Sequence, residues 1–70
     1  MIKKNTKLVF ENSNKIVEDS GGIPLSEGEH IILKTKRGEE TFKVIKKLVE
    51  CKEEGADLIA NITYRLAKVN

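Results

Sequence analysis

The longest regular pattern in this sequence is an alternation of apolar and polar residues over positions 57–68. Apolar or aromatic side chains occupy the even positions from Leu58 to Leu66, and the odd positions are mostly polar, with Ile59 as the clearest exception. Successive side chains of a β-strand point to opposite faces of a sheet, so the pattern predicts a strand with one buried and one solvated face. Such a strand is about 40 Å long when straight. A compact chain of this size has a radius of gyration of about 11 Å, so the strand must protrude or curl.

Residues 41–54 permit two interpretations. A strand places Phe42 and Val44 inward and then loses its phase, and a β-bulge near residues 45–47 restores the phase and bends the strand. A helix is more regular and gathers the apolar side chains on one side. However, β-branched and aromatic residues near the start and acidic residues near the end oppose a helix. We therefore expect a strand here, with one helix packed on a four-stranded sheet as the alternative.

Three shorter segments have the composition of strands, at residues 6–11, 15–18 and 29–35. Residues 1–5 are expected to form a mobile or late-docking end. Residues 12–14 are expected to form a turn, because Asn and Ser side chains bond to local backbone groups. Residues 23–28 contain Pro24, which lacks a backbone donor, and are expected to cross in an extended conformation. Together these elements predict an all-β domain of about five strands, in a small curled antiparallel sheet or barrel with a meander-like order.

Residues 24–45, which read PLSEGEHIILKTKRGEETFKVI, have a distinct order of features. A proline is followed by a turn glycine, an apolar strand, a basic turn with Gly38 at its positive-φ position, and an aromatic-x-valine strand. This order resembles the middle of small SH3-like β-barrels and covers about a third of the chain. The resemblance implies a barrel-like fold. It implies no function, because SH3-like barrels serve many unrelated roles.

Seventy residues form at most one domain, spanning 1–70, and a chain this short buries only about 60% of its unfolded surface. With one cysteine and one histidine, the chain forms neither an internal disulfide nor a usual four-ligand zinc site. Small domains without these links often gain stability from a partner subunit, so self-association is expected. No apolar run approaches the roughly 20 residues that span a membrane, and the N-terminus lacks the apolar segment of a secretory signal. The expected compartment is the cytoplasm.

The sequence contains no clear catalytic constellation. Cys51 and His30 can act as a nucleophile and base only if the fold brings them together, and a buried cysteine and a surface or strand-edge histidine are the simpler interpretation. The glycine pair at 21–22 does not fit a phosphate-binding loop, and the acidic residues around Gly55 do not fit a calcium-binding loop. We therefore expect a protein that is not an enzyme, with no catalytic residues, metal or cofactor.

Two binding functions follow from the remaining features. The favoured one is a non-catalytic protein-interaction or assembly module that binds an unknown protein partner or forms a homodimer. Exposed sheet edges and apolar patches serve this purpose. The candidate apolar residues are Ile32, Ile59 and Val69, which either form an outer patch or fill the open ends of a barrel.

The alternative is a nucleic-acid-binding small barrel that uses the basic block at residues 34–47. Its candidate phosphate contacts are Lys34, Lys36, Arg37, Lys43 and Lys47. Two features oppose this alternative. The only aromatic residues, Phe10, Phe42 and Tyr64, fall on faces assigned to the core, and an acidic stretch follows the basic block at residues 50–57.

Overall fold

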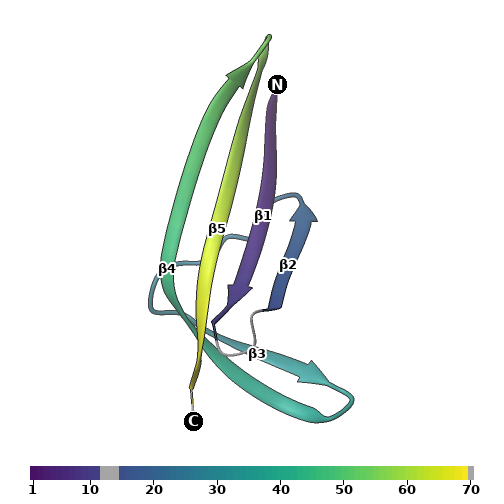
Figure 1. Ribbon diagram of the computed structural model, residues 1–70, viewed down its shortest axis with the longest axis vertical. Coiled ribbons are helices and arrows are strands. Elements are labelled where there is room, and N and C mark those ends of the chain that lie inside the picture. Colours follow the sequence, from purple (N-terminus) through teal and green to yellow (C-terminus); the bar gives the residue numbers. More distant parts are fainter. Residues whose placement is uncertain (12–14, 70) are drawn as a thin grey trace.

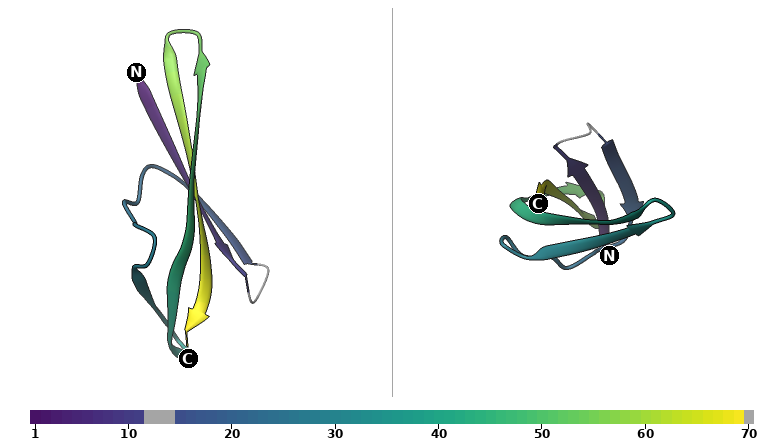
Figure 2. Two further views of the ribbon diagram at one scale, coloured as in Figure 1. Left: turned by 90° about the vertical axis from the view of Figure 1, so that its left-hand side faces the viewer. Right: turned by 90° about the horizontal axis from the view of Figure 1, so that it is seen from below.

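The computed structural model describes residues 1–11 and 15–69. The described chain forms one five-stranded sheet that is strongly curled into an open half-barrel (Figures 1 and 2). The strands are β1 (Ile2–Phe10), β2 (Lys15–Ser20), β3 (His30–Thr35), β4 (Gly38–Glu54) and β5 (Asp57–Val69). The predicted all-β curled sheet of five strands is confirmed, and the helical alternative for residues 41–54 is wrong. The described residues contain no helix, and hence none long and apolar enough to cross a membrane.

The strand order is β2-β1-β5-β4-β3, and one of its pairings differs from the expectation. β1 runs parallel to β5, with Ile2 opposite Leu58 and Phe10 opposite Leu66, whereas the other three pairings are antiparallel. The sheet is therefore mixed, and the purely antiparallel, meander-like order was wrong in this pairing. Parallel neighbours need a long crossover instead of a tight turn, and here β2, β3 and β4 all lie between the two strands in the sequence.

The first strand is longer than its sequence indicated. Residues 1–5 were expected to be a mobile end, but β1 begins at Ile2, because the first half of β5 provides a partner for each of these residues. The strands expected at residues 15–18 and 29–35 are confirmed, with ends that differ by at most two residues. The turn expected at residues 12–14 lies outside the described residues.

The β-bulge expected near residues 45–47 is confirmed. Val44 lies opposite Leu66 and Lys46 lies opposite Arg65, so Ile45 is the extra residue. As a result, the inward-facing side chains of β4 have even numbers before the bulge and odd numbers after it. A bulge also bends its strand, and Figure 1 shows β4 curving away from the sheet axis to run beside β3.

The core lies on the concave side of the half-barrel. Its buried members are the three aromatic residues and two aliphatic ones: Phe10, Phe42, Val44, Tyr64 and Leu66. The rings of Phe10 and Phe42 meet edge to face, with their centroids 4.8 Å apart. The chain between β2 and β3 crosses this concave side, and the Tyr64 hydroxyl holds it there by donating to the Ile23 carbonyl oxygen. The extended crossing expected at residues 23–28 is therefore present.

Candidate functional site

β4 and β5 extend beyond the covered core as a long arm, with the start of β1 alongside β5 (Figure 1). The segment between β2 and β3 crosses the sheet obliquely and reaches as far as Lys4, Ile62 and Lys47. Hydrogen bonds hold it in place: the Ile23 amide donates to Thr6 Oγ1 over 3.3 Å, and the Lys47 amide donates to a carboxylate oxygen of Glu27 over 3.0 Å. Beyond that line the concave side of the sheet has no cover among the described residues.

The rest of the concave side is apolar apart from Lys4 and Glu53, and we call its apolar residues the arm face. It consists of Ile2, Val49, Cys51, Leu58, Ala60 and Ile62. The pairing places these residues in rows, because cross-strand partners share a face: Val49 is opposite Ile62, and Cys51 is opposite Ala60. Ile2 is 64% exposed and Val49 is 49% exposed, although both continue the face that forms the core.

The opposite side of the arm is mostly polar. Its residues are Lys3, Asn5, Lys7, Leu48, Glu50, Lys52, Ile59, Asn61 and Thr63. Asn5 and Asn61 share a hydrogen bond of 3.1 Å there, and Lys3 lies 3.4 Å from Asp57. The arm is therefore amphipathic, with an apolar face that continues the core and a polar face toward water.

The shape of the molecule matches this uneven cover. It measures 44 × 23 × 19 Å, and its radius of gyration is 13.6 Å, against about 11 Å for a compact chain of this length. Its accessible surface is 5371 Å², whereas a compact monomer of 7.9 kDa exposes roughly 4,400 Å². The chain thus exposes about 1,000 Å² more than its mass requires.

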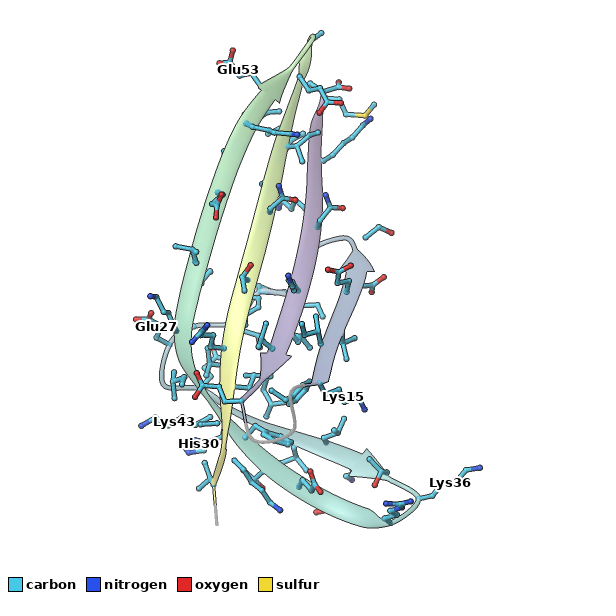
Figure 3. The ribbon with its side chains drawn as sticks, in the orientation of Figure 1. Lys15, Glu27, His30, Lys36, Lys43 and Glu53 are labelled. Carbon is cyan, nitrogen blue, oxygen red and sulfur yellow. The ribbon has the colours of Figure 1, made fainter. Side chains whose placement is uncertain are left out.

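The five basic residues that formed the candidate nucleic-acid site do not share one surface. Lys34 faces outward beside Glu39, with 3.9 Å between the charged groups, and Lys43 faces outward beside His30 (Figure 3). Lys47 comes after the bulge and faces inward, with its ammonium 5.7 Å from the centre of the Tyr64 ring. Only two of the five, Lys36 and Arg37, adjoin one another, in the turn between β3 and β4.

Lys36 and Arg37 line a depression of about 500 Å³ at the open end of the half-barrel, which we call the mouth. Its other lining residues are Phe10, Lys15, Leu33, Thr35, Glu40 and Phe42. Lys15 belongs to β2 and was not among the candidates, because in the sequence it lies far from the basic block. Its position became visible only through the pairing of β1 with β2, which places it opposite Phe10.

The less favoured interpretation of Cys51 and His30, a nucleophile and its base, is not supported by their positions. His30 of β3 lies opposite Lys43 of β4. Lys43 precedes Cys51 by eight positions on the same strand, so His30 and Cys51 are more than about 20 Å apart. The pair therefore cannot act together within one chain. Cys51 is exposed, not buried as expected. Among the described residues, no three His, Cys, Asp or Glu side chains gather in a group that could hold a metal ion.

The three apolar residues proposed as an outer patch are also divided. Ile32 and Val69 lie in one row, on either side of Thr41, whereas Ile59 lies opposite Lys52 near the far end of the arm.

In comparisons with protein-family models, curated proteins and solved structures, no match to this chain was found. The geometry thus defines a small mixed half-barrel with two distinctive surfaces, the arm face and the mouth.

Proposed function

We propose that this protein is a non-catalytic assembly module that forms a homodimer through its arm face. The observation that carries the proposal is that the apolar, core-forming side of the sheet continues onto the arm and lies open there. Exposed contiguous apolar surface of this kind is typical of interfaces. The proposal keeps two earlier expectations, the relation to SH3-like barrels and a place in the cytoplasm, where a lone cysteine stays reduced.

The surface area supports a partner of the size of a second copy. The chain exposes about 1,000 Å² more than a compact monomer of its mass, and a standard protein interface buries about 800 Å² on each partner. A symmetric dimer would remove this excess from both chains at once. It would also provide the stability that a domain without a disulfide or metal often takes from association.

The charges on the arm support an antiparallel arrangement of the two copies. Along β4, the inward positions run Lys47, Val49, Cys51 and Glu53, so opposite charges bracket the apolar rows. A two-fold axis between two antiparallel arms brings Glu53 of each copy toward Lys47 of the other. Lys4 also lies on this side, and its stem lies beside the covering segment: a Cβ added to Gly22 would lie 3.1 Å from Lys4 Cδ.

Two neighbouring residues provide a matched test. Val49 is 49% exposed on the arm face, and Leu48 is 47% exposed on the opposite side. We expect the wild-type protein to have twice the mass of the 7.9 kDa monomer by light scattering, and Val49→Asp to be monomeric, because a buried carboxylate disfavours association. Leu48→Asp is expected to remain dimeric. Circular dichroism would verify that both variants keep their strands.

A charge exchange tests the arrangement itself. Glu53→Lys is expected to weaken the dimer, and the double variant Glu53→Lys with Lys47→Glu is expected to restore it, because the pairing is then reversed on both sides. A wild-type protein that remains a monomer at millimolar concentration would refute the homodimer. Equal effects of Val49→Asp and Leu48→Asp would refute the arm face as the interface.

Nucleic acid is the weaker candidate partner. The five basic residues are divided between the two sides of the sheet, and the rings of Phe10, Phe42 and Tyr64 are buried. A surface that binds single strands needs a continuous basic track together with exposed aromatic rings.

A further inference from the structure

The mouth combines positive charge with an apolar floor. Lys15, Lys36 and Arg37 surround it together with one acidic residue, Glu40. The ion pairs formed among the described residues involve none of these four side chains. The mouth therefore carries an excess of positive charge that no ion pair among the described residues neutralises, although the protein as a whole has a net charge of only +2.

The floor of the mouth is formed by Phe10, Leu33 and Phe42. The two phenylalanine rings are 6% and 5% exposed and meet edge to face, so their position is fixed by the core. The accessible part of the floor is mainly Leu33, which is only partly buried, and it can bind an aliphatic group of a ligand by excluding water. It does not offer a free ring face for a nucleic-acid base to stack on.

The turn that carries two of the cations is held by its own hydrogen bonds. Thr35 Oγ1 donates to the Gly38 carbonyl oxygen and accepts from the Arg37 amide, both over 3.2 Å. The backbone of this turn is therefore preorganised, while the side chains of Lys36 and Arg37 remain available at the rim. In Figure 3, Lys15 and Lys36 project from the same side of the molecule.

The mouth lies between the two edge strands of the sheet. β2 pairs only with β1, and β3 pairs only with β4, so within the described chain each has one side without a partner strand. Lys15 from β2 and both Leu33 and Thr35 from β3 line the mouth. An extended peptide that enters it can therefore form backbone hydrogen bonds with an edge strand.

From these observations we propose that the mouth binds an acidic peptide segment in an extended conformation. Its carboxylates would pair with Lys15, Lys36 and Arg37, and an apolar side chain between them would lie on Leu33 and the ring edges of Phe10 and Phe42. In such a segment the apolar side chains share the face toward the floor, and the acidic ones share the opposite face, where the long side chains of Lys15, Lys36 and Arg37 at the rim would meet them. This binding function is separate from dimer formation, since the arm face lies beyond the other side of the covered core.

Another depression, of about 540 Å³, lies where β1 meets β2 and β5, but it does not suit a ligand as well. Several of its polar side chains already have partners: Asn5 donates to Asn61, Thr6 donates to the Gly21 carbonyl oxygen, and Lys7 lies 3.9 Å from Glu18. The mouth differs because its charged groups have no such partners among the described residues.

The test uses a fluorescent peptide of alternating glutamate and leucine, titrated with the full chain and followed by anisotropy. The variant Lys36→Glu/Arg37→Glu is expected to weaken binding at least about tenfold, because it replaces attraction with repulsion at the rim. Lys43→Glu/Lys46→Glu is the matched control, since it makes the same change of net charge on the outer side of β4. We expect it to change the affinity by less than about twofold.

Several outcomes would overturn the proposal. Equal losses in both charge variants would indicate attraction by net charge alone. Equal binding of a peptide made only of glutamate would show that the apolar floor is not used, and tighter binding of a single-stranded oligonucleotide would assign the mouth to nucleic acid. No binding at millimolar protein would refute the site. Val49→Asp is expected to bind the peptide normally, which separates this proposal from the homodimer.

Discussion

The hydroxyl of Tyr64 donates a hydrogen bond of 2.6 Å to the carbonyl oxygen of Ile23 and thereby joins the centre of β5 to the segment that covers it. The same hydroxyl accepts a hydrogen bond of 3.1 Å from the Leu25 amide. Tyr64 is fully buried, so these two backbone groups depend on it for their partners. The residue that lies at the centre of the core also determines where the cover of the concave side ends.

Replacing Tyr64 by phenylalanine is therefore expected to destabilise the protein by about 1–3 kcal/mol, because the ring stays while two backbone groups lose their partner. Urea denaturation would measure the loss. Asn61→Ala is the control, because Asn61 lies on the same strand as Tyr64 but its hydrogen bond to Asn5 is exposed. This variant is expected to lower the unfolding free energy by less than about 0.5 kcal/mol. Equal losses in the two variants would show that the Tyr64 hydroxyl does not hold the covering segment.

The edge-to-face pair of Phe10 and Phe42 makes a second prediction. Phe42→Leu is expected to lower the unfolding free energy by about 1–2 kcal/mol, through lost apolar contact and lost ring interaction. Phe42→Ala is expected to cost about 3–5 kcal/mol, a large part of the stability of a domain this size. Ile32→Ala, on the neighbouring strand and 58% exposed, is the control and is expected to be nearly neutral. A neutral Phe42→Ala would contradict the assigned core.

Two turn glycines are expected to respond differently to the same substitution. Gly55 has a φ of 62°, which asparagine adopts readily, whereas Gly38 has a φ of 128°, which few residues other than glycine adopt. No atom would obstruct a Cβ at either position, so the backbone alone decides the cost. Gly38→Asn is expected to destabilise by about 1–3 kcal/mol and Gly55→Asn by less than about 1 kcal/mol. Thermal melts that rank them in the opposite order would contradict these backbone conformations.

The local features of the fold could be predicted because they follow from neighbouring residues. The alternation from Leu58 to Leu66 indicates a strand whatever it pairs with, and the loss of phase after Val44 indicates a bulge. The aromatic residues were expected in the core for the same reason, and they are buried there. The basic block, in contrast, was a poor guide to a shared surface, because the bulge turns Lys47 to the side opposite Lys43.

The sequence by itself determined that the chain forms strands, where the long β4 strand bends, and which side chains of β5 face inward. Only the tertiary structure decided that β1 lies parallel to β5, that Lys15 joins Lys36 and Arg37 at the mouth, and that the segment between β2 and β3 stops short of the arm. The physical reason is the range of the interactions. Side-chain alternation is imposed by each residue's own backbone, whereas strand order and cover depend on contacts between residues far apart in the chain, which no local pattern specifies.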